Sequence, residues 1–135
     1  MARILIADDD EPTLAVLEAA VSGWRHETTL VREAAGVAPT VRAYKPELML
    51  LDYQFPTASG AQVLQRVRTM PEGVDLPVIF ISGTPVDLIR FNVDESPLVR
   101  ILAKPVSLDK LRSTIEEMLN AGPAGPESQG IEILK

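Results

Sequence analysis

Short apolar runs alternate with longer segments of helical hydrophobic spacing along most of the chain. Runs with hydrophobic side chains at successive residues are typical of strands that are buried on both faces of a sheet. These runs predict five strands, at residues 4–7, 28–31, 48–51, 77–81 and 98–103. The spacing between and after them predicts five helices, at residues 12–24, 36–44, 60–70, 86–91 and 107–120.

Strict alternation of strands and helices indicates βαβ units around a parallel sheet. We therefore predict a three-layer α/β sandwich, in which a five-stranded parallel sheet lies between two layers of helices. In such folds the ligand site lies at the carboxyl ends of the strands, near the point where the strand order reverses. The side chains that directly follow the strands are thus the candidates for function.

The hydrophobic positions also predict which helix faces pack on the sheet. The first helix has a proline in its first turn, and its predicted inward residues are Val16, Leu17, Ala20 and Val21. The inward residues of the helix at 60–70 are Val63, Leu64 and Val67. The last helix begins after Ser107, a good N-cap, and its predicted stripe consists of Leu108, Leu111, Ile115, Met118 and Leu119.

Composition and charge exclude several classes of function. The 135 residues include 13 basic and 19 acidic side chains, and this net charge of −6 argues against binding of nucleic acid or of an anionic membrane surface. The absence of cysteine excludes disulfides, thiolate catalysis and zinc–sulfur sites. His26 is the only histidine, so we expect it at the surface or partly packed rather than in a metal site.

The sequence predicts one domain, at residues 1–120, followed by a tail at 121–135. Gly and Pro are frequent in the first part of the tail, which favours a flexible linker, and Ile131–Lys135 form a small apolar cluster of unassigned role. The tail is too short for a DNA-binding module, which leaves a stand-alone protein or the amino-terminal piece of a longer one. The first apolar run is too short for a signal peptide or a membrane span, so we expect a cytoplasmic protein.

Five polar side chains follow four of the predicted strands. Asp8 and Asp9 follow the first, Asp52 the third, Ser82 the fourth and Lys104 the fifth. Parallel strands bring these ends to one edge, where three carboxylates repel one another unless a cation lies between them. Oxygen ligands of this kind favour Mg²⁺. With a lysine and a hydroxyl to bind phosphoryl oxygens, the set predicts phosphoryl transfer to a carboxylate.

Four segments carry a resemblance to the receiver domains of bacterial-type response regulators, the chemotaxis-regulator-like switches of two-component signalling. Residues 3–12 resemble the opening strand and acidic pair of that family, and residues 46–60 resemble its phosphoacceptor segment. Residues 79–83 and 103–105 resemble its hydroxyl and lysine segments. The resemblance covers residues 3–119 and implies a flavodoxin-like fold with strand order 2-1-3-4-5.

The resemblance implies a role for each residue at the strand ends. Asp52 would be the phosphoacceptor, Ser82 the switching hydroxyl and Lys104 the phosphoryl-binding ammonium, with a cis peptide before Pro105. The implied ligands of Mg²⁺ are Asp8, Asp9, Asp52 and the backbone carbonyl of Gln54. The implied phosphoryl donor is a histidine kinase or a histidine phosphotransfer protein, and the implied target is a downstream protein or an attached output domain.

The acidic run also allows a second alignment. Matching on Glu11 and Pro12 would choose Asp9 and Asp10 as the pair, but would turn Glu18 toward the core. We therefore choose the pair at positions 8 and 9.

The chain departs from the family at two positions. Ile101 stands where many receivers carry Tyr or Phe, and residue 106, often aromatic, is Val. The usual route from phosphorylation to the output face is therefore in question, and a degenerate receiver that binds partners constitutively is the alternative. A phosphate-ester hydrolase is disfavoured because the general acid expected two residues after the nucleophile is Gln54. We expect no conventional enzyme, only a chain that promotes its own phosphorylation and dephosphorylation.

Overall fold

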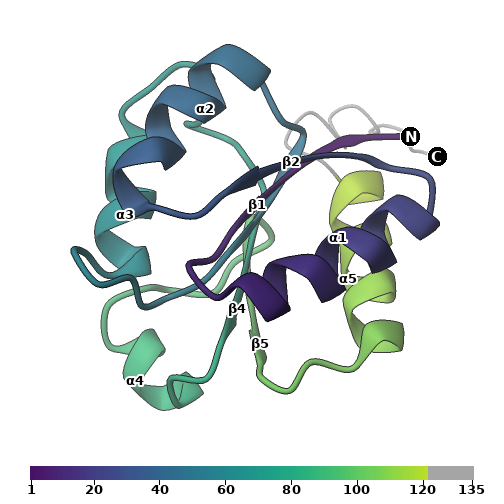
Figure 1. Cartoon of the computed structure of the whole chain (residues 1–135). Helices are drawn as coiled ribbons and strands as arrows, with labels where there is room; N and C mark the ends of the chain where they lie inside the picture. The colour runs from purple at the N-terminus through teal and green to yellow at the C-terminus, as the bar shows by residue number, and fades with distance from the viewer. Residues whose placement is uncertain (122–135) are drawn as a thin grey trace, which may run out of the picture.

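The computed structural model describes residues 1–121, which form five strands and five α-helices in the predicted alternation (Figure 1). The strands are β1 (Arg3–Ala7), β2 (Glu27–Val31), β3 (Leu48–Leu51), β4 (Val78–Ser82) and β5 (Val99–Ala103). The helices are α1 (Glu11–Gly23), α2 (Val37–Tyr44), α3 (Gly60–Arg68), α4 (Val86–Arg90) and α5 (Leu108–Ala121). A short 3₁₀ turn, Ala34–Gly36, leads into α2.

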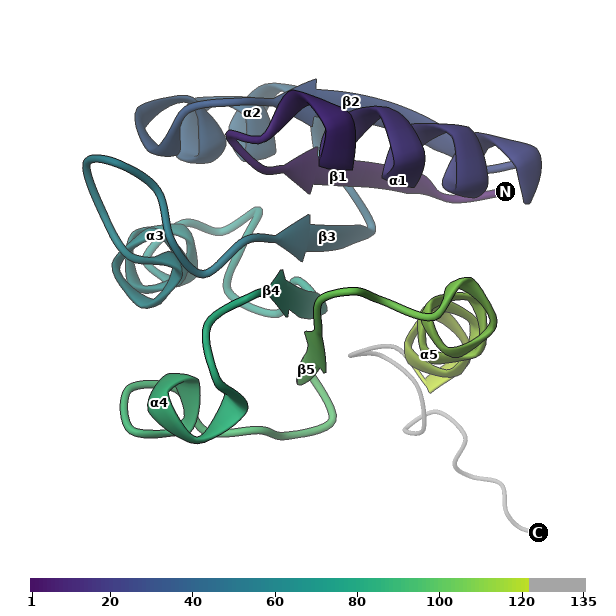
Figure 2. The ribbon, with the colours of Figure 1, turned by 60° about the horizontal axis from the view of Figure 1, so that its bottom comes forward.

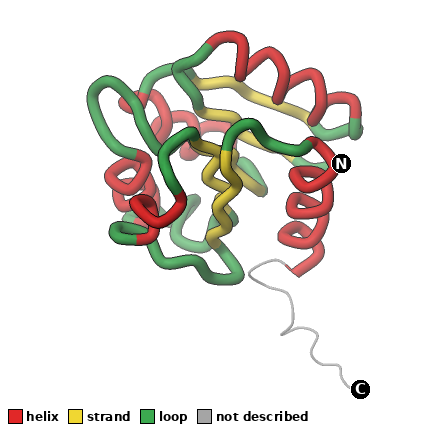
Figure 3. The backbone as a smooth tube through the Cα atoms, turned by 90° about the horizontal axis from the view of Figure 1, so that it is seen from below, coloured by secondary structure: helices red, strands yellow, loops and turns green. Residues whose placement is uncertain are grey.

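All five strands are parallel and lie in the order β2-β1-β3-β4-β5, which confirms the predicted flavodoxin-like topology. In Figure 2, β1, β3 and β4 point the same way, so their carboxyl ends share one edge. Helices α1 and α5 cover one face of the sheet, and α2, α3 and α4 cover the other (Figures 1 and 3). The strand order reverses between β1 and β3, which is where a ligand site is expected.

Two hydrophobic clusters lie on opposite faces of the sheet because successive strand side chains point to opposite sides. The cluster under α2, α3 and α4 includes Leu5, Met49, Leu51, Phe80 and Ile101. The cluster under α1 and α5 includes Ile4, Ile6, Leu50, Ile79 and Ile81. The central strands are buried on both faces, as their continuous apolar runs predict.

The inward face of α1 differs from the prediction. Val16 is 55% exposed, whereas Leu14, which was not predicted inward, is buried beside Leu17 and Val21. Residues 14, 17 and 21 follow the three- and four-residue spacing of one helix face, and a residue next to Leu17 is turned about 100° away from that face. The predicted burial of Leu17 and Val21 is confirmed, and Ala20 is partly buried.

The stripe of α5 also needs one correction. Leu108, the first residue of α5, is 41% exposed, while Leu111, Ile115 and Met118 are buried. The buried position that the hydrophobic pattern does not show is Thr114, whose hydroxyl donates to the carbonyl of Lys110 (2.7 Å). The predicted inward residues of α3 are all buried.

Side-chain caps fix the beginnings of three helices. Asp10 caps α1 by accepting from the backbone N–H of Thr13 (3.1 Å). Ser59 and Gln62 form a reciprocal capping box at α3. Ser107 accepts from the N–H of Lys110 (3.2 Å), which confirms the predicted cap of α5. These caps satisfy N–H groups that have no partner within the helix.

The edge of the sheet that carries the amino ends of the strands has its own network of bonds. The Arg3 guanidinium donates to the carbonyl of Lys45 (2.7 and 3.1 Å), and the Glu47 carboxylate accepts from the Arg3 N–H (2.9 Å). The half-buried His26 accepts at Nδ1 from the N–H of Ala2 (3.1 Å), as expected for a partly packed histidine. This network ties the starts of β1 and β3 together.

Two sequence predictions concern the end of the chain. Ala121 ends α5, whereas the rest of the predicted tail, with its cluster Ile131–Lys135, lies outside the described residues. Among residues 1–121, none of the helices combines the length and the hydrophobicity that a membrane crossing requires.

Candidate functional site

The three carboxylates predicted at the strand ends converge in the structure. One oxygen each of Asp8, Asp9 and Asp52 lies within 4.8 Å of the other two. The backbone fixes this arrangement, because the N–H of Asp8 donates to Val31 (3.0 Å) and that of Asp52 to Ala7 (2.9 Å). These bonds carry the sheet one residue past the ends of β1 and β3, so both aspartates are held by the sheet.

The three carboxylates differ in their contact with water. Asp8 and Asp52 are 1% and 7% exposed, whereas Asp9 is open to solvent. Burial raises the pKa of Asp8, and the negative charge of Asp52 acts in the same direction. The Asp10 N–H, 2.9 Å from Oδ1 of Asp8, and the ammonium of Lys104 oppose this rise. Buried carboxylates this close require positive charge beside them.

Lys104 supplies positive charge from the end of β5. Its Nζ lies 3.0 Å from Oδ2 of Asp8 and 3.7 Å from Oδ2 of Asp52. Burial disfavours the ammonium form, but the hydrogen bond to Asp8 and the charge of Asp52 outweigh burial and raise the pKa of Lys104. The Lys104 N–H donates to the carbonyl of Ser82 (2.9 Å), and the Lys104–Pro105 peptide is cis, as the resemblance implied.

Ser82 is the last residue of β4, and Gln54 lies on the loop between β3 and α3, two residues after Asp52. Ser82 is buried at the end of β4, and its Oγ accepts from the N–H of Thr84 (3.1 Å). The Gln54 N–H lies 3.4 Å from Oδ1 of Asp52, and the Gln54 side chain accepts from the hydroxyl of Thr84 (3.3 Å). Thr84 was not found from the sequence, because its contacts depend on how two loops approach each other.

Asp10 has a different place from its two acidic neighbours. Its Oδ2 accepts from the N–H of Thr13, so this carboxylate caps α1 and lies outside the set of converging oxygens. The hydrogen bond to Thr13 lowers the pKa of Asp10. The geometry therefore supports Asp8 and Asp9 as the acidic pair.

Gly60 closes the turn that follows Asp52. Its N–H donates to the carbonyl of Tyr53, and a Cβ atom at position 60 would lie 2.7 Å from the Asp52 carbonyl oxygen and from the Phe80 ring. Only glycine fits this approach without a shift of the loop. Helix α3 begins at Gly60, so its packing positions the phosphoacceptor candidate.

Ile101 and Val106 are packed on opposite faces of the sheet. Ile101 is 8% exposed and is the register partner of Phe80, within the cluster under α2, α3 and α4. Val106 packs against the cluster under α1 and α5. Ile101, the aliphatic side chain at the position where many receivers carry an aromatic one, thus lies in the core between β5 and α4.

The donor set fits a hard divalent cation. Three carboxylates supply oxygen atoms at one point, one carboxylate is open to solvent, and no cysteine or second histidine exists in the chain. Mg²⁺ prefers such ligands, with water completing its coordination. Chemically, a buried carboxylate beside an ammonium and a cation site can accept a phosphoryl group.

Comparisons with known proteins agree with this geometry. The sequence model described as "Response regulator receiver domain" matches residues 4–116. The chain is 31% identical over 126 residues to the 3′,5′-cyclic-nucleotide phosphodiesterase regA of Dictyostelium discoideum, covering 88% of this chain but only 15% of that protein. It is 22% identical over 116 residues to the polar-differentiation response regulator DivK of Brucella anthropi, covering 86% of this chain and 94% of DivK.

Among solved structures, the chain is similar to the receiver domain of the sensor histidine kinase PA1611 from Pseudomonas aeruginosa. The TM-score is 0.79 at 20% sequence identity, and the match covers 87% of this chain and 97% of the other. That crystal structure contains a magnesium ion coordinated in the active site cleft of PA1611. At this identity, the similarity shows a shared fold.

Proposed function

The chain belongs to the response regulator receiver domain family of two-component signalling, and on that premise we propose that it is a switch controlled by phosphorylation of Asp52. The observation that carries this proposal is the convergence of Asp8, Asp9 and Asp52 at one sheet edge, with Lys104 Nζ within 3.0 Å of one carboxylate and 3.7 Å of another. Receiver domains act as signalling switches rather than as conventional enzymes.

The phosphoryl group would come from a phosphohistidine of a histidine kinase or of a phosphotransfer protein. A carboxylate oxygen of Asp52 attacks phosphorus, the P–N bond breaks, and its electron pair remains on the imidazole nitrogen of the donor. Lys104 donates hydrogen bonds to the transferred phosphoryl oxygens, a role that suits its position beside Asp52. The chain modifies only itself and turns over no metabolite.

Asp8, Asp9, Asp52 and the backbone carbonyl of Gln54 are the proposed ligands of Mg²⁺. When bound, Mg²⁺ would offset the negative charge of the phosphoryl oxygens and of the acidic cluster. The magnesium ion in the PA1611 receiver supports this assignment by analogy. We also propose a cytoplasmic location for this chain, as expected for a switch of two-component signalling.

Ser82 is the proposed switching residue. Ser82 is the last residue of β4, next to the strand that leads to Asp52, and its Oγ accepts from the Thr84 N–H. Its O–H can therefore donate to a phosphoryl oxygen on Asp52. Phosphorylation would then shift an equilibrium between two arrangements and change the affinity for a downstream protein or an attached output domain.

The test uses acetyl phosphate as the donor, with and without Mg²⁺, and intact mass as the measurement. We expect one phosphoryl adduct on the wild type in the presence of Mg²⁺ and none on Asp52→Asn. Asp87→Asn is the matched control, because Asp87 is a strongly exposed aspartate on α4 and its loss leaves the acidic cluster unchanged.

Two results would contradict the proposal. An adduct on Asp52→Asn would place the phosphoacceptor elsewhere. A wild type that takes no phosphoryl group and binds no Mg²⁺ in a calorimetric titration would favour the alternative, a degenerate receiver that binds partners constitutively.

A further inference from the structure

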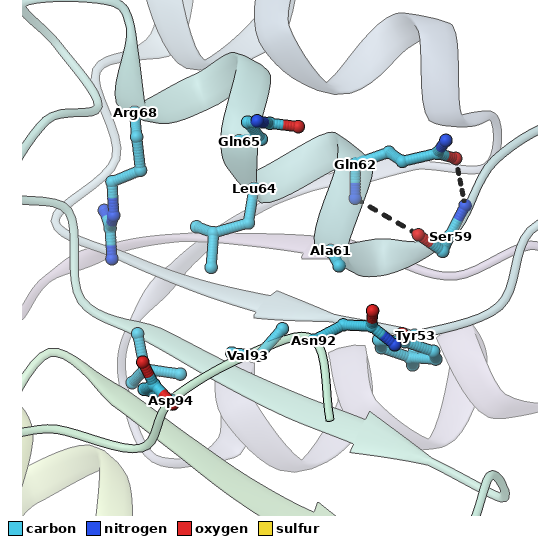
Figure 4. Close-up of a pocket in the computed structure, with 11 residues that line it drawn as sticks. Tyr53, Ser59, Ala61, Gln62, Leu64, Gln65, Arg68, Asn92, Val93 and Asp94 are labelled. Atoms are coloured by element: carbon cyan, nitrogen blue, oxygen red, sulfur yellow. Dashed lines mark hydrogen bonds between the residues drawn. The ribbon is translucent and has the colours of Figure 1, made fainter. Parts of the chain in front are cut away.

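Tyr53, the residue after the proposed phosphoacceptor, is bonded to the segment that follows α4. Its hydroxyl oxygen accepts from the side-chain amide of Asn92 at 3.0 Å. Asn92 lies two residues after the end of α4, and Figure 4 shows its amide directed at the Tyr53 ring. A side chain from the β3–α3 loop thus meets the α4–β5 segment, 39 residues further along the chain.

The Tyr53 ring also touches the core beside the aliphatic position described above. Its edge packs on Phe80, with ring centroids 5.9 Å apart and an interplanar angle of 65°. Phe80 is fully buried and is the register partner of Ile101. Tyr53 is therefore an aromatic side chain that contacts the core next to Ile101 while holding a polar partner at the surface.

A groove of about 760 Å³ lies beside the Tyr53–Asn92 bond. Figure 4 shows α3 on one side of this groove and residues 92–94 on the other, with Tyr53 at one end. Side chains of α3 therefore do not fill the space beside the ring, which leaves Tyr53 room to change its position. Val93, next to Asn92, is buried in the same cluster as Phe80 and Ile101, so a shift of residue 92 reaches the core.

Phosphorylation would act directly on the backbone that carries Tyr53. The Asp52 carboxylate accepts from the Gln54 N–H and pairs with Lys104, and the first of these contacts spans residue 53. A phosphoryl group on Asp52 adds oxygen atoms that compete for both donors. The backbone from 52 to 54 would then adjust to the new contacts, and the Tyr53 side chain would move with it.

We propose that Tyr53 carries the signal from Asp52 to the α4–β5 segment through its hydrogen bond to Asn92, in place of an aromatic residue at position 101. This inference rests on the proposed function for its trigger, whereas the bond itself exists in the resting chain. Tyr53 acts as a positioning residue, because it takes no part in the transfer of the phosphoryl group.

The first experiment measures hydrogen–deuterium exchange of residues 86–95 in the unphosphorylated full chain. Tyr53→Phe keeps the ring and its contact with Phe80 but removes the hydroxyl. Asn92→Leu keeps the shape but removes the donor. We expect each substitution to raise exchange in this segment about two- to tenfold, and the double variant to exceed neither single one.

Two controls separate the bond from a general loss of structure. Asn92→Asp offers a carboxylate that can accept from the Tyr53 hydroxyl, so exchange should stay within about twofold of the wild type. Phe91→Ala removes a side chain that is 83% exposed next to Asn92, and should leave the exchange of residues 92–95 unchanged. Equal exchange in the wild type, Tyr53→Phe and Asn92→Leu would overturn the inference.

The second experiment repeats the measurement after acetyl phosphate and Mg²⁺, with intact mass taken on the same samples. We expect phosphorylation to change exchange of residues 86–95 in the wild type and in Asn92→Asp, and this change to fall by at least about half in Tyr53→Phe and Asn92→Leu. The amount of adduct should be the same in all four chains. An equal response in all four, or none in the phosphorylated wild type, overturns the inference.

Failure of the proposed function gives a different result. A wild type that takes no phosphoryl group and binds no Mg²⁺ refutes the phosphoryl switch and removes the trigger from the inference. The comparison of the unphosphorylated chains still decides whether the Tyr53–Asn92 bond restrains the α4–β5 segment.

Discussion

Gly60 lies so close to Asp52 that a Cβ atom on Gly60 would stand 2.7 Å from the carbonyl oxygen of Asp52. The same atom would lie 2.7 Å from the Cα of Tyr53 and from the Phe80 ring. Three groups would have to move to admit one methyl group, and two of them are backbone. The first residue of α3 therefore determines the shape of the loop that presents the proposed phosphoacceptor, Asp52.

Replacing Gly60 by Ala should destabilise the fold and slow phosphorylation. We expect the free energy of unfolding to fall by about 1–3 kcal/mol, the usual cost of overpacking a filled site. Urea denaturation measures this change, and the rate of adduct formation with acetyl phosphate measures its effect on the loop. Gly23→Ala is the control, because a Cβ there meets nothing within 4 Å, and it should be neutral or slightly stabilising. Equal effects of both substitutions would contradict this account.

Substitutions of the three adjacent aspartates should differ in their effect on the affinity for Mg²⁺. Asp8→Asn and Asp9→Asn each remove a proposed ligand, and we expect affinity for Mg²⁺ to fall at least about tenfold. Asp10→Ala should keep the affinity within about twofold but lower the melting temperature, because it removes the cap of α1. Calorimetry and a thermal melt give the two quantities. Loss of Mg²⁺ binding in Asp10→Ala, with normal binding in Asp8→Asn, would instead favour the alternative alignment.

Arg68 should be the arginine of α3 on which stability depends. Its guanidinium donates to the carbonyls of Gly73 (2.8 Å) and Leu76 (2.7 Å) and so holds the loop before β4. Arg68→Met keeps most of the hydrocarbon stem but leaves both carbonyls without this donor, and we expect a loss of about 2–4 kcal/mol. Arg66→Met, on an exposed position of the same helix, should cost less than about 0.5 kcal/mol. Guanidinium chloride denaturation measures the free energy of unfolding of both variants, and equal losses would contradict this role of Arg68.

His26 should make the fold less stable as the pH falls. Burial lowers the pKa of His26, the amino-terminal ammonium adds to this shift, and Glu116 and Glu47 oppose it. As the pH falls through 6.5, His26 is therefore protonated in the unfolded chain but remains neutral in the folded chain. The free energy of unfolding decreases over this range and becomes constant below the folded-state pKa of His26.

The comparison of interest is between the wild type and His26→Gln, whose amide oxygen can still accept from the Ala2 N–H. Free energies of unfolding measured between about pH 7.5 and pH 5 should converge or cross toward low pH, because only the wild type carries the histidine penalty. A constant difference between the two chains over this range would show that His26 does not contribute to the pH dependence.

The sheet and the acidic cluster were predictable from the sequence for one reason. An apolar run that is interrupted by Asp52 marks both a buried strand and its end, and parallel strands bring such ends together. The faces of α1 and α5 were predicted less well. Hydrophobicity alone placed Val16 and Leu108 inward, although the phase of a helix on the sheet is set by the whole packed face.

Other contacts depend on how the loops fold and cannot be predicted from the local pattern of hydrophobic and polar residues. Nothing in the sequence distinguishes Arg68 from Arg66, since only the course of residues 73–76 gives one of them carbonyl partners. The bond between Tyr53 and Asn92 likewise joins the β3–α3 loop to the segment after α4, two irregular segments that are 39 residues apart in the sequence. Sequence reasoning finds residues that a regular element delivers to an edge, and misses partners that irregular segments bring together.

The bonds that join Arg3, Lys45 and Glu47 lie at the opposite edge of the sheet from the acidic cluster. Active sites often impose a trade-off, in which a change that improves stability reduces activity. In this fold the amino edge of the sheet holds none of the proposed chemical groups. We therefore expect substitutions at this edge to change the melting temperature while Asp52 and its neighbours keep their geometry, so that stability can be tuned apart from the proposed phosphoryl chemistry.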